Sequence, residues 1–290
     1  MLIGYMDETG HSDDPALHFA GMAGFVAPLE KWIAFEREWQ PTLADYKLRE
    51  PFHMKDFAHS FGQFVDWKDK NEKRKELFGK LIAIIRKTEA KPIGAIVSLE
   101  AYEGLHVEQQ KHFHSPYMLV FQLCTRGMAL EGLGTPANEK VEMVYSYNKE
   151  YGTTQTTPYS ADQAGNAERL WHEIKKQTDF GRWMGSYASR TPADTVQLQA
   201  ADIIAYELSK DFENRIRRPN DRMRFGLREI LRMSHIPLPM IRFFDRRELL
   251  RLIVEASFPC RIGVEELERT QELSAMESMI RWMVTRGDWK

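Results

Sequence analysis

Two acidic positions far apart in this chain hold the side chains that are best suited to chemistry. The first is the pair Asp7-Glu8, which ends an apolar, strand-like run and is followed by a polar turn. The second is Asp202, which interrupts the otherwise apolar stretch 196–208. A carboxylate buried in such a stretch costs several kcal/mol or stays protonated, so Asp202 needs a basic partner, a backbone donor or a polar cleft.

These two positions would form a carboxylate pair if the first strand and the Asp202 helix packed together. Two such carboxylates repel each other unless a cation lies between them, and Mg²⁺ and Mn²⁺ prefer oxygen ligands. A metal ion held there can activate water and stabilise the leaving group of a phosphate ester. We therefore predict that Asp7 and Asp202 bind Mg²⁺ or Mn²⁺. The simpler alternatives are an Asx-type turn at Asp7, and an internal arginine or a capped backbone beside Asp202.

The helix that carries Asp202 also has a narrow polar stripe. Its other positions are apolar nearly all round, which is typical of a buried helix. Gln199, Asp202 and Tyr206 stand at positions i, i+3 and i+7, which share one face of a helix. The stripe favours a polar cleft along this face.

An arginine-rich segment follows this helix directly. Residues 213–232 contain seven arginines and three acids, a local charge of +4 in a chain whose net charge is −2. Because arginine binds phosphate in a bidentate manner, the segment favours contact with a nucleic-acid backbone. The residues predicted to make this contact are Arg217, Arg218, Arg222 and Arg224. The alternative is that these arginines pair with acids on neighbouring helices.

The composition of the 290-residue chain excludes several classes of protein. Hydrophobic residues make up 43% and charged residues 28%, so the composition is that of a folded protein and not of a disordered one. The two cysteines fit no metal-binding pattern. No run approaches the roughly 18 apolar residues of a membrane span, and no secretory signal is recognisable. We expect a cytoplasmic protein with no membrane partner.

The elements that must position these residues alternate between strands and helices. The hydrophobic patterns predict strands at 2–7, 17–27, 91–99, 140–147 and 182–188, of which the first two form a hairpin. They predict helices at 30–46, 115–130 and 162–177. Two more helices are predicted to begin at caps, one at Asn71 and one at Asp194 or Thr195. This order predicts an α/β domain with a mixed sheet and flanking helices.

The chain is expected to divide into a main domain, residues 1–233, and a C-terminal extension, residues 234–290. The extension carries two or three helical patterns. Its apolar positions, among them Met276, Met279 and Met283, could cover the core or form the interface of a homo-oligomer.

Four segments of the chain together resemble one family. They are "MDETG" after the first strand, the small-residue strand "HFAGMAGFV", "FHMKDF" downstream and "LQAADIIAYEL" in the late helix. In order and spacing they are similar to the DUF3800 family of prokaryotic proteins, over about residues 3–230. The resemblance implies a ribonuclease H-like fold and, by analogy with such enzymes, a metal-dependent nuclease or another role in nucleic-acid processing.

The resemblance also implies roles for particular residues. It implicates five positions, which are Asp7, Glu8, His53, Gln199 and Asp202. His53 could move a proton or orient a phosphate, and the plain alternative is a surface or capping histidine. Gln199, and Lys55 beside His53, are predicted to contact nucleic acid.

One position departs from the family pattern. The family commonly has an acid at the end of the strand that here reads "VEMVYSYNKEY", where this chain has Ser146. Ribonuclease H-like catalysis normally uses three or four carboxylates, so this departure weakens the expected metal site. Glu150 or Glu8 could complete the set.

These observations favour a divalent-metal-dependent nuclease or phosphodiesterase that acts on nucleic acid. Asp7, Asp202 and Glu150 would be metal ligands, Glu8 an auxiliary acid and His53 a proton-transfer group. One alternative is a catalytically incomplete ribonuclease H-like scaffold that binds nucleic acid or a protein. Another is an ATPase or phosphotransferase of the related actin-like architecture, which "DETG" loosely permits although the sequence has no second glycine-rich phosphate loop.

Overall fold

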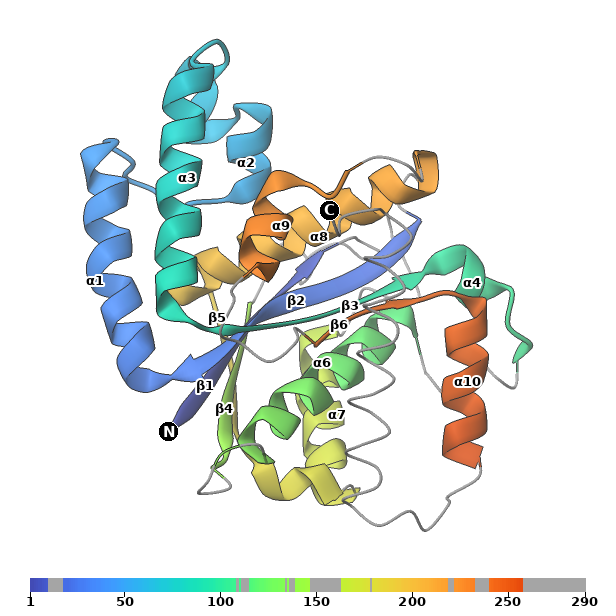
Figure 1. The fold of residues 1–290 in the computed structure, drawn as a ribbon. Helices are drawn as coiled ribbons and strands as arrows, with labels where there is room; N and C mark the ends of the chain where they lie inside the picture. Colours follow the sequence, from blue (N-terminus) through green and yellow to red (C-terminus); the bar gives the residue numbers. More distant parts are fainter. Residues whose placement is uncertain are drawn as a thin grey trace.

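A mixed sheet of six strands forms the centre of the molecule (Figure 1). The computed structural model describes residues 1–9, 18–107, 110, 115–133, 135, 139–146, 163–177, 179–218, 222–232 and 240–257. The strands are β1 (Leu2–Thr9), β2 (Phe19–Pro28), β3 (Lys91–Ser98), β4 (Val141–Ser146), β5 (Met184–Arg190) and β6 (Met240–Phe244). Their order in the sheet is β5-β4-β1-β2-β3-β6.

The direction of the strands decides which side chains meet at the edge of the sheet. β1, β2 and β3 are antiparallel neighbours, whereas β4 and β5 run parallel to β1, and β6 runs parallel to β3. In the β1–β4 pairing Met6 lies opposite Tyr145. The next residues along the two strands, Asp7 and Ser146, are therefore neighbours at the carboxyl ends of β1 and β4.

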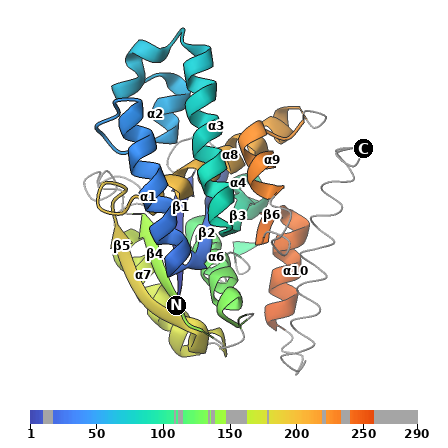
Figure 2. The same ribbon diagram turned by 60° about the vertical axis from the view of Figure 1, so that its left-hand side comes forward.

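Helices cover both faces of this sheet (Figures 1 and 2). One face packs against α1 (Leu29–Asp45), α3 (Asn71–Thr88), α8 (Gln197–Arg217) and α9 (Phe225–Leu231). The opposite face packs against α4 (Leu99–Glu103), α6 (Pro116–Leu133), α7 (Gln163–Gln177) and α10 (Arg246–Ser257). Two short elements, α2 (Met54–His59) and the 3₁₀ helix η1 (Gly62–Trp67), connect α1 to α3, and a second 3₁₀ helix, η3 (Asp179–Trp183), precedes β5.

The alternation of side chains along β1 sends its two acids to different faces. Ile3 and Tyr5 belong to the apolar cluster on the α8 face, whereas Leu2 and Met6 belong to the cluster on the α6 face. Because successive side chains of a strand point to opposite sides, Asp7 follows Tyr5 onto the α8 face. Glu8 follows Met6 onto the α6 face.

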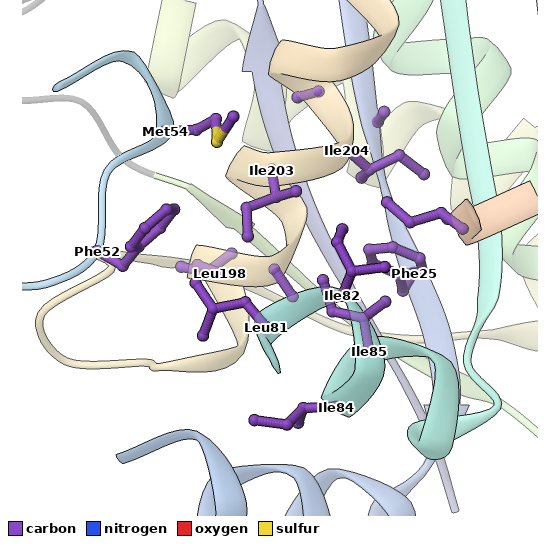
Figure 3. Packing of buried hydrophobic residues seen from close by; sticks show 14 of the residues in the cluster. Phe25, Phe52, Met54, Leu81, Ile82, Ile84, Ile85, Leu198, Ile203 and Ile204 are labelled. Atoms are coloured by element: carbon purple, nitrogen blue, oxygen red, sulfur yellow. The ribbon is translucent and has the colours of Figure 1, made fainter. Parts of the chain in front are cut away.

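Helix α8 crosses β1 and β2 and is buried along most of its length, as its apolar pattern predicts. Leu198, Ile203 and Ile204 are fully enclosed, and Figure 3 shows them packed with side chains of α3 and β2. Phe52 and Met54, from the segment that enters α2, lie beside the same helix in that view. This packing fixes α8 over the end of β1.

The α/β class and the mixed sheet with flanking helices are confirmed, and the observed order is compatible with the ribonuclease H-like arrangement that the resemblance implies. Two predicted helix caps differ. Asn71 is the first residue of α3 rather than its cap, and α8 begins only at Gln197. Asp194 does not cap α8, because it forms a turn in which Thr191 donates a 2.6 Å hydrogen bond to its carboxylate.

The C-terminal extension differs from the expected row of helices. Its described part starts with β6, which pairs with β3 and so belongs to the same sheet as the main domain. Helix α10 follows, and residues 258–290 lie outside the described part of the chain. Within the described ranges, none of the helices is long and apolar enough to cross a membrane.

Substitution of Gly24 is expected to disrupt the pairing of β1 with β2. Gly24 lies opposite Met6, and a Cβ atom there would stand 1.9 Å from the carbonyl oxygen of Tyr5. Gly24→Ala should lower the free energy of unfolding by about 1–3 kcal/mol or more, because backbone must move. Gly79→Ala in α3, where a Cβ meets nothing within 4 Å, should instead stabilise by about 0.5–1 kcal/mol. Urea denaturation measures both, and equal effects would contradict the steric argument.

Candidate active site

Helix α8 packs over β1, so that the negative charge of Asp202 acts on the carboxylate of Asp7 on this face of the sheet. Burial, followed by the negative charge of Asp202, raises the pKa of Asp7. Burial, followed by the charge of Asp56, also raises the pKa of Asp202, whose side chain is only 11% exposed. Two acids so far apart in sequence therefore share one electrostatic environment in which their negative charges are poorly offset.

A backbone amide holds the Asp202 side chain, and a histidine lies beside it. The Met54 N–H donates to Oδ2 at 2.5 Å and lowers the pKa of the acid, without cancelling the effect of burial. The other oxygen, Oδ1, lies 3.9 Å from Nε2 of His53. The capped backbone that the sequence allowed as an alternative is thus present, but it uses only one of the two oxygens.

His53 lies between two acids. Its Nδ1 is 3.3 Å from Oδ2 of Asp56, and its Nε2 faces Asp202. An acid beside Nδ1 orients the ring and favours the proton on that nitrogen, which leaves Nε2 to exchange a proton. The His53 side chain is 50% exposed, so it is accessible to a ligand.

Asp7 is held by two hydrogen bonds. The Glu8 N–H donates to Oδ1 at 3.0 Å, and the Ser146 hydroxyl donates to the carboxylate, and both lower the pKa of Asp7. Ser146 thus stands beside Asp7 at the position where the family pattern has an acid. It offers a neutral donor there and adds no negative charge.

Gln199 positions the segment that carries His53. Its side-chain oxygen accepts from Trp39 Nε1 at 2.9 Å and from the Phe52 N–H at 3.0 Å, and its nitrogen donates to the Pro192 carbonyl at 3.1 Å. The residue is 4% exposed. This differs from the expected contact with nucleic acid, because the buried amide is already satisfied within the protein and ties α1 and the α2 segment to α8.

Glu8 is separated from the acid pair by the sheet itself. On the α6 face it forms a hydrogen bond with the Tyr117 hydroxyl, and burial together with the charge of Asp7 raises its pKa to about 8. The expected role as an auxiliary acid of the same site therefore lacks the required placement. Glu150, the other acid expected there, lies outside the described residues.

The arginine-rich segment is largely engaged with acids, as the alternative interpretation allowed. Arg224 pairs with Glu207, and its Nη2 lies 2.6 Å from Glu207 Oε1. The backbone N–H of Arg224 donates to the carboxylate of Asp211. Arg218 and Arg222 are exposed, and the side chain of Arg217 lies outside the described part. Of the arginines predicted to contact phosphate, Arg222 is therefore still available by its exposure. Arg224 is instead engaged by Glu207.

Exposed cations also lie close to the acid pair. Lys55 is exposed on α2, as its predicted role requires. Arg190 is exposed on β5 opposite Ser146, which itself neighbours Asp7 on β1. Strand β4 lies between β5 and β1, so the backbones of Arg190 and Asp7 are two strand spacings, or about 10 Å, apart. Residues that lie opposite one another on neighbouring strands point to the same face of the sheet, so both side chains lie on the α8 face. Sequence reasoning missed Arg190 and the pairing role of Asp56, because neither has a diagnostic spacing.

The described residues form no group of three or more His, Cys, Asp and Glu side chains that is arranged to hold a metal ion. Asp7 and Asp202 alone would give a metal ion two carboxylate ligands. Mg²⁺ commonly binds one or two protein carboxylates and completes its shell with water and substrate phosphate. The donor set therefore fits a cation that the substrate helps to hold.

Comparison with known proteins gives no independent guide to this site. No family model matches the chain, and no curated protein is similar to it at a significant level.

The raised carboxyl pKa values are expected to make the protein less stable as pH rises. Between about pH 4 and 7 the native chain binds protons at Asp7, Asp202 and Glu8 more tightly than the unfolded chain does, and Glu8 continues to do so up to about pH 8. A proton that only the native chain retains lowers the free energy of unfolding by at most about 1.4 kcal/mol per pH unit in its window. Urea denaturation in EDTA should therefore show a fall in stability from about pH 5 to 8.

Neutral substitutions test the source of this fall. Glu8→Gln and Asp7→Asn should each make it shallower, whereas Asp45→Asn, at an exposed position at the end of α1, should not. A wild-type stability that rises between these pH values would contradict the protonation of the buried acids.

Proposed function

We propose that the protein is a divalent-metal-dependent phosphodiesterase that cleaves nucleic acid at the Asp7–Asp202 pair. The observation that carries this proposal is the packing of α8 over β1, which puts the buried Asp202 beside the accessible His53 and within electrostatic reach of the half-buried Asp7, and the pKa of both acids is raised. Burying two like charges together is costly, and a bound cation would remove that cost. The resemblance of four short segments to the DUF3800 family supports this assignment, and on that resemblance alone we propose membership of the family.

Each residue of the site has a distinct task in this proposal. Asp7 and Asp202 would hold Mg²⁺ or Mn²⁺, and the bound ion would supply a water of lowered pKa and positive charge to offset the phosphate. His53, oriented by Asp56, accepts a proton from the attacking water or donates one to the leaving oxygen. Ser146 fixes the orientation of the Asp7 carboxylate. Lys55 and Arg190 are placed to attract the phosphate backbone.

Asp202→Asn is expected to abolish Mn²⁺- or Mg²⁺-dependent cleavage while the fold is retained. The amide keeps an oxygen for the Met54 N–H but removes a charge that the cation requires. Mn²⁺ should raise the melting temperature of the wild type and of the exposed control Asp45→Asn, but not that of Asp202→Asn or Asp7→Asn. His53→Gln should keep this thermal shift and lose about 10²- to 10⁴-fold in cleavage rate.

Two results would remove this assignment. One is cleavage by Asp202→Asn at the wild-type rate, and the other is a Mn²⁺-induced thermal shift that is the same in the wild type and in both acid variants.

A non-catalytic scaffold is the second candidate, and Ser146 is the observation that favours it. With serine beside Asp7, the site has one carboxylate fewer than ribonuclease H-like catalysis normally uses. Such a scaffold would bind nucleic acid or a protein without cleaving it. Asp7 and Asp202 would then be remnants of a metal site.

Ser146→Asp separates the two candidates. The new carboxylate would lie beside Asp7 and should tighten Mn²⁺ binding about tenfold or more in calorimetry, whereas Ser146→Ala should not. For an enzyme, the wild type already cleaves and the variant needs less metal. For a scaffold, cleavage begins only with Ser146→Asp. Unchanged Mn²⁺ affinity in Ser146→Asp would contradict a cation site at this place.

A further inference from the structure

A row of aromatic rings leads from the acid pair to the surface of the molecule. Tyr206 lies one helical turn after Asp202 on α8, and its hydroxyl is 3.4 Å from Nε2 of His59. The His59 ring stacks on Phe61, with centroids 5.7 Å apart and planes inclined by 23°. We call Tyr206, His59 and Phe61 the ring strip.

The outer end of the ring strip is exposed to solvent. Phe61 is 57% exposed and His59 is also exposed, although large apolar side chains are normally buried. The backbone turn explains this position, because Ser60 adopts a left-handed conformation with φ 57° and ends α2. Phe61 is thereby turned away from the aromatic core that encloses Phe57 and Phe64.

A second connection joins Phe61 to the acid pair. The Phe61 N–H donates to the Asp56 carbonyl at 2.9 Å, and the carboxylate of Asp56 lies beside His53, which faces Asp202. The turn at Phe61 and the proton-transfer histidine are thus parts of one short segment. A ligand bound at Asp202 can continue along this segment onto exposed rings.

Cationic groups lie near the inner ring of the strip. The Lys210 ammonium and the Arg224 guanidinium each lie 5.9 Å from the centre of the Tyr206 ring. Glu213 and Glu207 hold these cations in place through ion pairs. These ion pairs offset the charge of Lys210 and Arg224, so the two cations fix the Tyr206 ring rather than bind phosphate. Proteins that bind single-stranded nucleic acid combine stacking rings with cations, and Lys55, exposed on the same helix as His59, is a cation suited to that role.

We propose that the ring strip binds unpaired bases, so that the substrate is single-stranded nucleic acid. This inference rests on the proposed function for the location of the cleaved phosphate, but the binding itself does not require cleavage. Bases of a duplex are stacked within the helix and cannot lie on Phe61, whereas bases of a single strand can. Stacking accepts the face of any base, so binding depends on strandedness more than on sequence.

Binding without cleavage tests the proposal directly. Fluorescence anisotropy in EDTA would compare a fluorescein-labelled oligo(dT) with a labelled duplex of the same length. The wild type should prefer the single strand, and Phe61→Ala should weaken that binding by about 5- to 100-fold while leaving duplex binding unchanged. Phe61→Trp should retain it, because an indole also stacks. Val65→Ala is the matched control, since Val65 is 65% exposed on the neighbouring η1.

A second assay separates this proposal from the function on which it rests. Hydrolysis of bis(p-nitrophenyl) phosphate with Mn²⁺ reports on the acid pair and needs no base. Phe61→Ala should hydrolyse it at the wild-type rate. If the wild type fails to hydrolyse this ester but Phe61→Ala loses single-strand binding, the phosphodiesterase is refuted and the ring strip stands.

Three outcomes overturn the ring strip itself. They are equal binding of single strand and duplex by the wild type, equal single-strand affinity of Phe61→Ala and the wild type, and no binding of nucleic acid at all. The last outcome is expected if the strip instead covers a protein partner.

Discussion

The electrostatic repulsion between Asp7 and Asp202 is the constraint on which the candidate site depends. Two carboxylates that share a poorly solvated place bind protons or a cation more tightly than exposed acids do. The fold favours this proximity, because buried apolar side chains between Leu198 and Leu208 pack α8 over β1. Stability at neutral pH is thereby reduced locally, and such a cost is commonly found where a protein binds or reacts.

The surrounding hydrogen bonds limit how the acids can respond to this repulsion. Asp202 cannot turn away without leaving the Met54 amide unpaired, and Asp7 is held from both sides by Glu8 N–H and Ser146. His53 is the movable member, since it is half-exposed and contacts acids at both ring nitrogens. The site therefore combines two fixed anionic groups with one accessible group that can carry a proton.

The sequence predicted strands β1 to β5, the buried helix α8 and the two acids. These features follow from the spacing of hydrophobic residues and from the polar residues that interrupt it. Sequence reasoning could not separate Asp7 from Glu8, since their opposite directions follow from the register of β1 and not from adjacency. It assigned Gln199 to a ligand although the amide is used internally, because the partners Trp39 and Phe52 are remote in sequence. The sequence did not predict strand β6 either, because its pairing with β3 joins segments that are remote in sequence.

Gln199 has a consequence for how the molecule assembles. Its side chain joins segments 147 and 160 positions away, so these hydrogen bonds to Trp39 and to Phe52, next to His53, form only after α8 has packed against the N-terminal helices. Contacts of such high contact order form late and add cooperativity, since each requires a large loop to close first. Nascent chains that stop before α8 therefore contain Asp7 and His53 but have no organised centre, and activity can arise only once synthesis has passed that helix.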